Sequence, residues 1–395
     1  MVDAQPIEEQ TLLGYKHKRY YPIKIGQALK ERYRLIAKLG YGAYSTVWVA
    51  WDGRSGNSAA SSTNQYATIK VCIEQKDVAD SPVLNEVNVL QRMKKFADAA
   101  DHPGLCFTRL ASDVFEVTSP QGRHSCIASK PQGHSLRELQ TAFPDAKVPR
   151  LLVRSLIHRL LFSINWLHAI CGLIHTDISP QNVLTELGDD SSLEYIEEQE
   201  SVDPSVPVTG DNDTPVYPSL TPMLELSGIL IVTDFGHVRD VESTNRGWWM
   251  SDLHRAPEVL LQLPWSYPVD LWSVGVMALE LLEGKRLFDP SDCTNGQYVL
   301  PLALVQYIGY LGPPPLPMVQ KSPLFPTYFE ERGNWISEPA IPKLSLEDFI
   351  TTIPPGEEKD LFLKFIRSLL TWDPDTRASA NGIIPDEWLM RPNLE

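Results

Sequence analysis

The stretch that most constrains this chain runs from residue 173 to residue 184 and reads L-I-H-T-D-I-S-P-Q-N-V-L. In it Asp177 is followed five residues later by Asn182, in a loop between two apolar runs. The string alone is weak, because an Asp and an Asn at this spacing occur by chance in many loops. Six further features stand around it in a fixed order: Gly40-Tyr41-Gly42, Ile69-Lys70, Glu86, Asp234-Phe235-Gly236, Ala256-Pro257-Glu258 and Arg377. Seven ordered features are a strong signal.

Composition narrows the class of protein. With 395 residues, 43% of them hydrophobic, the chain can form one large domain or two ordinary ones around a sizeable core. The formal net charge of −15 argues against a general nucleic-acid binder and favours cationic partners. Five scattered cysteines without a C-x-x-C pair fit a reducing compartment. No apolar run approaches the roughly 20 residues of a membrane span, and the N-terminus has no signal-peptide pattern, so we expect a soluble intracellular protein.

The first third of the chain has mostly the pattern of β-strands. A basic, aromatic stretch at 15–22 is expected to lie as an extended arm on the lobe that follows. Three segments rich in β-branched and aromatic residues lie within 33–72, and the Ser/Asn/Ala-rich run 53–64 predicts a long hairpin loop. Residues 80–95 then change to helical spacing, with Glu86 among the apolar residues of one face.

Helices are predicted to dominate after a hinge at Pro131-Gln132-Gly133. Residues 149–169 are apolar on most of their circumference, as expected of a core helix, and the helical pattern returns at 358–371. Between these helices, residues 186–227 contain eleven Asp or Glu and no Lys or Arg. Such a segment buries too little apolar surface to fold alone, so we expect a mobile acidic insert that attracts cationic segments.

Several of these residues suit phosphoryl transfer, which needs charge stabilisation and alignment of donor and acceptor. Gly40 and Gly42, in a turn between two strands, would let backbone N–H groups approach phosphates. Lys70 ends a strand, and Glu86 on the following helix could pair with it and fix its ammonium against the phosphates.

Oxygen ligands and a proton acceptor are available as well. Asn182 and Asp234 could hold Mg²⁺, which prefers such hard donors, and Asp177 could accept the proton of a substrate hydroxyl. Taken alone, Glu258 and Arg377, 119 residues apart, would be two surface charges. Within the ordered set of motifs we expect instead a buried ion pair that braces the second lobe.

Together these residues resemble the eukaryotic protein kinases over residues 33–392, and the SR-protein kinases in particular. Five features carry the second likeness: Tyr21 to Gly26 ahead of Arg32-Tyr33, Ser45-Thr46-Val47-Trp48, His175-Thr176-Asp177, the insert 186–227, and Leu311 to Pro315. The resemblance implies an α+β bilobal fold, with a β-rich N-lobe and a helical C-lobe. The divisions it implies are an N-terminal extension 1–32, an N-lobe 33–131 and a C-lobe 132–392 that contains the insert.

The resemblance also implies roles for single residues and for the whole protein. Asp177, Lys70 and Glu86 are implied as catalytic residues, and Asn182 and Asp234 as ligands of Mg²⁺. The implied ATP-binding residues are Leu39, Gly40, Gly42, Val47, Lys70 and Gln132. The implied protein is a monomeric serine/threonine kinase of the cytoplasm and nucleus that phosphorylates basic Arg/Ser-rich splicing proteins, without direct nucleic-acid or membrane contacts.

The chain departs from the kinase pattern near the expected site. Ser179 stands where the family has a lysine that contacts the γ-phosphate, and Gln181 replaces an acidic or similar residue. Ser129 is at the gatekeeper position of the adenine pocket, Lys130 replaces a common hinge acid, and Thr68 replaces an alanine against adenine.

Two functions therefore stay open. The first is an active phosphotransferase, favoured because Lys70, Glu86, Asp177, Asn182 and Asp234 are all retained. The second is a pseudokinase, a binding scaffold with the same fold, favoured by Ser179. If the chain is active, Thr176 in place of the usual arginine before the catalytic acid predicts activity without phosphorylation of the activation segment.

Overall fold

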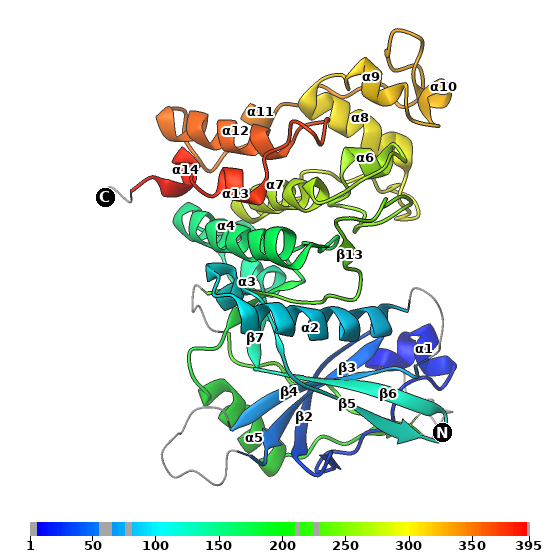
Figure 1. The fold of residues 1–395 in the computed structure, drawn as a ribbon, viewed down its shortest axis with the longest axis vertical. Helices are drawn as coiled ribbons and strands as arrows, with labels where there is room; N and C mark the ends of the chain where they lie inside the picture. Colours follow the sequence, from blue (N-terminus) through cyan, green and yellow to red (C-terminus); the bar gives the residue numbers. More distant parts are fainter. Residues whose placement is uncertain (1–5, 55–64, 76–80, 210–213, 225–228, 393–395) are drawn as a thin grey trace.

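The computed structural model describes residues 6–54, 65–75, 81–209, 214–224 and 229–392, and stacks two lobes along the long axis of the molecule (Figure 1). One lobe is built on an antiparallel sheet of six strands in the order β1-β2-β3-β4-β6-β5. The strands are β1 (Ala28–Leu29), β2 (Tyr33–Gly42), β3 (Ser45–Asp52), β4 (Tyr66–Cys72), β5 (Ala111–Ser119) and β6 (Gly122–Ser129). The three predicted β segments are confirmed as β2, β3 and β4. Most of the predicted hairpin loop, 55–64, lies outside the described residues.

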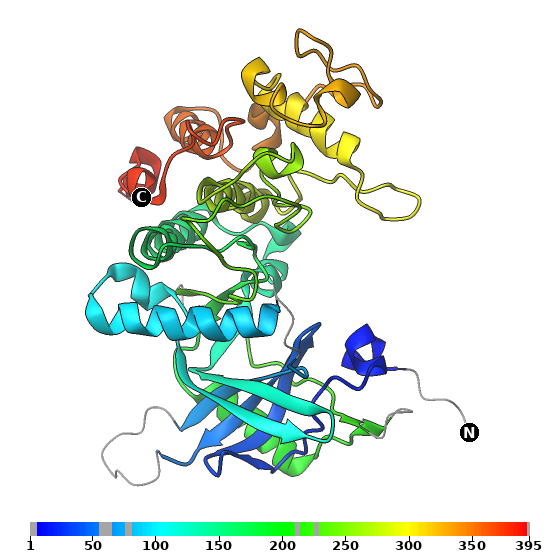
Figure 2. The same ribbon diagram turned by 45° about the vertical axis from the view of Figure 1, so that its right-hand side comes forward.

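Helix α2 (Pro82–Ala99) lies between the sheet and the other lobe (Figures 1 and 2). It begins with a proline in its first turn, where the missing N–H has no intrahelical partner to lose. Its buried face consists of Val83, Glu86, Val89, Leu90 and Met93. The predicted helix is thus confirmed, although it ends at Ala99 rather than at residue 95.

The second lobe is helical, and its axis is α7 (Pro268–Glu283), in which every residue is buried. The other helices of this lobe are α3 (Leu136–Thr141), α4 (Arg150–Asn165), α6 (Pro257–Leu260), α8 (Leu300–Leu311), α9 (Leu316–Val319), α10 (Phe325–Tyr328), α11 (Leu346–Phe349), α12 (Glu357–Leu369), α13 (Ala380–Ile383) and α14 (Glu387–Met390). Helices α4 and α12 confirm the two helical predictions in this lobe. Helix α4 continues into a π-helical turn, Trp166–Cys171, and ends at Gly172, whose φ of 62° suits glycine.

Short strands frame the loops between the lobes. A three-stranded sheet has the order β12-β9-β7, made of β7 (Gln132–Ser135), β9 (Val183–Glu186) and β12 (Leu230–Val232). A second pair consists of β8 (Leu173–Ile174) and β13 (Arg239–Asp240). The chain leaves the large sheet at Ser129 and enters the small one at Gln132, while the boundary between residues 131 and 132 stays a prediction.

The prediction of a mobile acidic insert that does not fold is wrong for the described residues of 186–227. They include helix α5 (Ser191–Val202) and a strand pair, β10 (Val208–Thr209) and β11 (Pro215–Val216), which lie against the β-rich lobe (Figure 1). Leu193 and Ile196 of α5 are buried in one cluster with Ile36 and Val49 of the large sheet. The insert has few apolar residues of its own, but the sheet supplies the other half of the buried surface.

The N-terminal segment also lies on this lobe, as expected, although it is not extended throughout. It forms a short 3-10 helix, η1 (Glu8–Thr11), and a single helical turn, α1 (Leu13–Lys16). Tyr15 and Tyr20, from the aromatic stretch, are buried at 6% and 5% exposure. The basic stretch is therefore part of the packed structure.

Candidate active site

The loop between β8 and β9 holds Asp177 and Asn182 together. The Asn182 side-chain amide donates hydrogen bonds to the Asp177 backbone carbonyl (2.9 Å) and to its Oδ2 (2.7 Å). This contact uses the amide nitrogen, so the amide oxygen of Asn182 is the atom left to bind a cation. The five-residue spacing thus brings a carboxylate and an amide oxygen to one place.

A buried aspartate that was not predicted from the sequence binds the backbone of this loop. Asp270 of α7 accepts hydrogen bonds from the backbone N–H groups of His175 (2.7 Å) and Thr176 (2.8 Å), and contacts His168 Nε2 (2.8 Å). Thr176 has a φ of 67°, an unfavourable conformation for a β-branched residue, which these bonds help to hold. The available signal was an acid within the segment 268–279, in which Ser273 is the one other polar side chain apart from the Trp272 indole.

Lys70, Glu86 and Asp234 meet between the lobes. Lys70 Nζ lies 2.7 Å from Glu86 Oε2, 2.9 Å from Glu86 Oε1 and 3.4 Å from Asp234 Oδ1. The positive charge of Lys70 lowers the pKa of Asp234 to about 2, so this carboxylate is ionised at neutral pH. Burial works against the charge on Lys70, but Glu86 and Asp234 outweigh it and raise the Lys70 pKa.

A second cation near this pair, Arg109, was not predicted. Its Nη2 lies 3.9 Å from Glu86 Oε1, and its side chain is only 14% exposed. Glu86 therefore stands between two positive charges. Arg109 follows a short 3-10 segment, η3 (Pro103–Phe107), with no motif around it, so only the fold could reveal its position.

The glycine-rich turn joins β2 to β3. A Cβ added at Gly40 or Gly42 would meet no described atom within 4 Å, and neither residue has a positive φ. Neither the packing of the chain nor its backbone conformation therefore requires glycine here. Close approach of a ligand to the backbone remains as the reason, which fits a phosphate group.

A cavity of about 90 Å³ lies under this turn. It is lined by Gly42, Ser45, Lys70, Glu86, Asp234 and His237, among others. The remaining predicted nucleotide contacts lie on adjoining strands. In the strand register, Val47 is opposite both Gly40 and Lys70, and Gln132 is opposite Glu186. Leu39 is half-buried beside the insert.

The arrangement fits ATP with Mg²⁺. Asp234 supplies an ionised carboxylate and Asn182 a free amide oxygen, both hard donors. Within the described residues, no three His, Cys, Asp or Glu side chains converge on a metal site. A magnesium ion held by Asn182 and Asp234 would therefore need further oxygen ligands, which phosphate groups supply.

Comparison of the sequence with known proteins shows the family to which the chain belongs. The sequence model of the protein kinase domain matches residues 33–389. The chain belongs to the protein kinase family. A serine/threonine protein kinase of Aspergillus fumigatus is 31% identical to it, over 98% of this chain and 92% of that protein. The serine/threonine-protein kinase SRPK of Physarum polycephalum is 26% identical over 97% of this chain and 91% of its own, and mouse SRSF protein kinase 3 is 29% identical over 46% and 30%.

These matches confirm the predicted enzyme class, a serine/threonine protein kinase similar to the SRPK group, and its bilobal fold. The predicted use of ATP and Mg²⁺ agrees with the family in general. No helix within the described ranges is long and apolar enough to span a membrane.

Three of the departures from the kinase pattern, Ser179, Ser129 and Thr68, are buried, whereas Lys130 and Gln181 are exposed. Ser179 is 5% exposed, and its carbonyl accepts the N–H of Asn182 (3.0 Å). Ser129 and Thr68 lie opposite each other on β6 and β4, at 4% and 6% exposure. Lys130 pairs with Glu186 (2.5 Å) at the surface of the hinge. The family lysine is thus replaced by a small polar group close to Asp177 in sequence.

The activation segment, which runs from Asp234-Phe235-Gly236 to Ala256-Pro257-Glu258, is held by a buried arginine. Arg255, at 3% exposure, donates hydrogen bonds to the carbonyls of Trp249 (2.9 Å) and Met250 (2.9 Å), and to Asp252 (2.7 Å). Its guanidinium also lies 4.2 Å from the centre of the Trp248 ring.

The predicted ion pair that follows this segment is confirmed. Arg377 donates to both carboxylate oxygens of Glu258, at 2.8 and 2.9 Å, and both side chains are almost fully buried. Arg377 also donates to the carbonyls of Pro268 and Thr371, so the pair links α6 to the start of α7 and to the C-terminal part of the lobe.

Proposed function

We propose that this chain is an active ATP-dependent serine/threonine kinase that phosphorylates Arg/Ser-rich proteins. The observation that carries the proposal is the assembled set of polar groups. Lys70 is paired with Glu86 and lies 3.4 Å from Asp234, while Asp177 is held by Asn182. A scaffold has no physical need for both arrangements.

Each residue has a role in this proposal. Lys70, fixed by Glu86, binds the α and β phosphates, and Asn182 and Asp234 bind Mg²⁺. When bound, ATP would supply the phosphoryl group, and Mg²⁺ would neutralise part of the negative charge of its phosphates. Asp177 orients the substrate hydroxyl and accepts its proton. Gly40 and Gly42 let the backbone approach the phosphates, and Leu39, Val47 and Gln132 contact the nucleotide.

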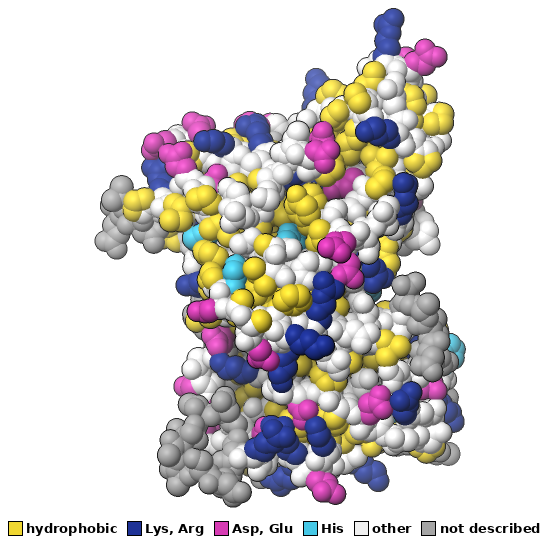
Figure 3. Space-filling model, in the orientation of Figure 1, with side chains coloured by type: hydrophobic (Ala, Val, Ile, Leu, Met, Phe, Trp, Pro, Cys, Tyr) yellow, Lys and Arg dark blue, Asp and Glu magenta, His cyan; other side chains and the backbone are white. Residues whose placement is uncertain are grey.

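The proposed substrate class rests on charge and on two relatives. The chain carries a formal net charge of −15, and carboxylates of α5 and of the residue after it, Glu194, Glu198 and Asp203, are exposed. The names of the Physarum and mouse relatives include SRPK and SRSF protein kinase. On the face shown in Figure 3, basic and acidic side chains are interspersed, so we infer a basic substrate from the net charge and from these exposed carboxylates.

The test is transfer of radioactive phosphate from ATP to an Arg/Ser-repeat peptide. We expect transfer by the wild type and loss of it in Asp177→Ala. The control Asp101→Ala changes an exposed acid outside the site and should leave transfer intact. A Lys/Ser-repeat peptide of equal charge tests whether arginine itself is required. Equal transfer by wild type and Asp177→Ala would contradict the proposal.

Ser179 favours a second candidate function, a pseudokinase scaffold. Nucleotide affinity separates the two, because a scaffold can bind ATP without transferring phosphate. Binding of Mg²⁺-ATP at micromolar concentrations together with no transfer to any Arg/Ser peptide would favour the scaffold. We also propose, as the family resemblance implies, that the protein is a monomer, which light scattering tests. We propose that it occurs in the cytoplasm and nucleus, which microscopy tests, and that it makes no direct nucleic-acid or membrane contacts.

A further inference from the structure

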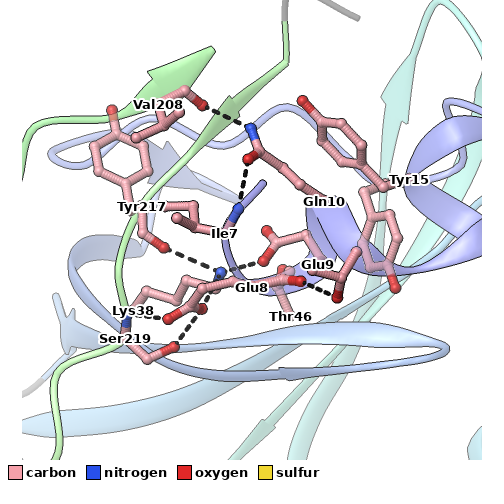
Figure 4. Close-up of polar contacts among 12 residues, drawn as sticks. Ile7, Glu8, Glu9, Gln10, Tyr15, Lys38, Thr46, Val208, Tyr217 and Ser219 are labelled. Atoms are coloured by element: carbon pink, nitrogen blue, oxygen red, sulfur yellow. Dashed lines mark hydrogen bonds and ion pairs between the residues drawn. The ribbon is translucent and has the colours of Figure 1, made fainter. Parts of the chain in front are cut away.

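A fully buried ammonium joins three distant segments on the β-rich lobe. Lys38 lies on β2, two residues before Gly40, and its side chain is 0% exposed. Its Nζ lies 2.7 Å from Glu8 Oε2, contacts the Glu9 carboxylate, and donates to the carbonyl of Tyr217 at 3.1 Å (Figure 4). The N-terminal segment, the strand that leads into the glycine-rich turn, and the insert therefore meet at one charge.

The two carboxylates around Lys38 have pKa values that shift in opposite directions. Burial alone would raise the pKa of Glu8, but hydrogen bonds from Lys38 and Ser219 outweigh it and lower that pKa. Glu9 is more deeply buried, and there burial prevails and raises the pKa. A buried ammonium that loses its partners is costly, so the three segments are expected to stay together.

The N-terminal segment and the insert also bind each other directly (Figure 4). Glu8 accepts hydrogen bonds from both the N–H and the hydroxyl of Ser219, each at 2.7 Å. Two further bonds are Gln10 Nε2 to the Val208 carbonyl (3.3 Å) and Tyr15 Oη to the Thr214 carbonyl (3.0 Å). Residues 6–22, which we call the N-terminal strap, are thus fixed at their start.

The other end of the N-terminal strap touches the glycine-rich turn. The Tyr20 hydroxyl donates to the Gly42 carbonyl at 2.7 Å. Burial raises the pKa of this hydroxyl to about 12, so it stays protonated and remains a donor. The Arg19 carbonyl next to it accepts the N–H of Glu74 (2.7 Å), two residues after β4, the strand that carries Lys70.

We propose that Tyr20 is a positioning residue for ATP, because the N-terminal strap, locked by Lys38, lets its hydroxyl fix the glycine-rich turn over the phosphate site. The inference rests on the proposed function for its nucleotide and goes beyond it in assigning a role to residues outside the matched kinase domain.

The physical link is the planarity of the peptide bond. In a trans peptide the C=O and the following N–H lie in one plane and point in opposite directions. A hydrogen bond that fixes the Gly42 carbonyl toward Tyr20 therefore also fixes the N–H of Ala43, directed away from Tyr20. Ala43 lines the cavity with Lys70 and Asp234. A preset N–H spares ATP the cost of ordering this turn.

The test compares Tyr20→Phe with Tyr21→Phe. Each removes one hydroxyl, but the Tyr21 hydroxyl accepts a hydrogen bond from Gln27, which lies outside the turn. Two quantities are measured: hydrogen exchange of the amides at 40–46, referred to exchange in β6, and the affinity for Mg²⁺-ATP from displacement of a fluorescent nucleotide. In Tyr20→Phe we expect faster exchange at 40–46 and about two- to tenfold weaker ATP binding, the usual range for one hydrogen bond. The KM for ATP should rise by the same factor with a smaller change in kcat, and Tyr21→Phe should match the wild type.

A second variant tests the lock. Glu9→Gln keeps the size of the side chain but removes one of the two carboxylates that contact Lys38. We expect it to speed hydrogen exchange at 40–46, as Tyr20→Phe does. Unchanged exchange and unchanged ATP affinity in Tyr20→Phe, or equal changes in Tyr21→Phe, would overturn the positioning role. Hydrogen exchange does not require catalysis. A wild type that transfers no phosphate, with Tyr20→Phe still loosening the turn and weakening ATP binding, would overturn the proposed activity alone.

Discussion

Ser179 is the residue at which this kinase departs most from its family in chemical terms. The family lysine contacts the γ-phosphate, where charge shifts during transfer, whereas Ser179 is a small, buried neutral group. Preorganised charges of this kind stabilise the transition state more than the bound substrate. Lys70 and Arg109 supply two cations beside Glu86, but neither belongs to the loop that carries Ser179.

We predict that Ser179→Lys raises kcat more than it changes the KM for ATP. By analogy with single preorganised donors, the gain in kcat is at most about 10²- to 10³-fold, and a hydroxyl or water bond already made by Ser179 would reduce it. The measurement is kcat and KM for ATP with one Arg/Ser peptide. Gln181→Lys is the control, since it adds the same charge at an exposed position two residues away. A gain confined to KM, or one equal in the control, would show that residue 179 has no role in the transition state.

At the scale of elements, the activation segment is ordered by contacts within the protein. Arg255 binds two carbonyls and one carboxylate of the segment, and Thr176 places no positive charge before Asp177 that a phosphate would have to neutralise. The loop that carries Thr176 is held by Asp270.

We predict that treatment with a phosphatase leaves the turnover number unchanged. The measurement is the rate of peptide phosphorylation before and after treatment, with complete dephosphorylation checked by mass spectrometry. A kinase that requires a phosphorylated activation segment serves as the positive control. A large loss of turnover after treatment would contradict the prediction. It would indicate that the contacts of Arg255 are not sufficient to order the activation segment without a phosphate group.

Another contact between elements titrates with pH. Glu283, at the end of α7, accepts hydrogen bonds from the backbone N–H and the hydroxyl of both Thr351 and Thr352, at 2.6 to 3.0 Å. Burial alone would raise its pKa, but these bonds outweigh burial and lower it. Because the folded pKa lies below the unfolded one, the stabilisation is complete above about pH 4.3 and is lost as the pH falls through the folded pKa.

We predict that Glu283→Gln lowers the free energy of unfolding by about 1 to 3 kcal/mol at pH 7, because the amide –NH2 that replaces one carboxylate oxygen is itself a donor and faces at least one of these four donors. The difference from the wild type should shrink as the pH is lowered from 6 to 3. The measurement is urea unfolding of both proteins along this pH range. A difference that stays constant down to pH 3 would mean that the charge of Glu283 is not what these bonds stabilise.

At the scale of the whole molecule, the net charge of −15 is the property most relevant to substrate capture. The expected mobile acidic insert is instead folded, and part of its charge is used internally. Glu197, for example, accepts hydrogen bonds from Trp51 (2.6 Å) and Tyr66 (2.7 Å). The exposed carboxylates Glu194, Glu198 and Asp203 remain available to attract a basic peptide.

We predict that replacing these three by Gln, Gln and Asn raises the KM for an Arg/Ser peptide at low salt more than at high salt. Their field extends over about a Debye length, roughly 8 Å at physiological ionic strength, and salt shortens it. The measurement is KM for the peptide at about 0.05 M and 1 M salt, with a neutral Ser peptide as control. An equal change in KM at both concentrations would refute the electrostatic explanation.

The sequence by itself determined the fold class, the order of the lobes and several of the residues that meet at the candidate site, among them Lys70, Glu86 and Asp234. Periodicity of two and of 3.6 residues is a local property, so β2 to β4, α2, α4 and α12 could be predicted from it. The grouping of Asp177 with Asn182 could be predicted from their spacing of five residues. The contact between Glu258 and Arg377 is long-range, and it could be predicted because the set of kinase motifs implied it.

Only the tertiary structure decided the partners of residues without a motif. Asp270, Arg109 and Lys38 acquire their roles from segments that are far away in sequence, and no local pattern records those contacts. The insert was wrongly predicted for the same reason. Its own composition is too polar to fold alone, but burial energy depends on both surfaces in contact, and the apolar face of β2 and β3 supplied the surface that Leu193 and Ile196 lacked.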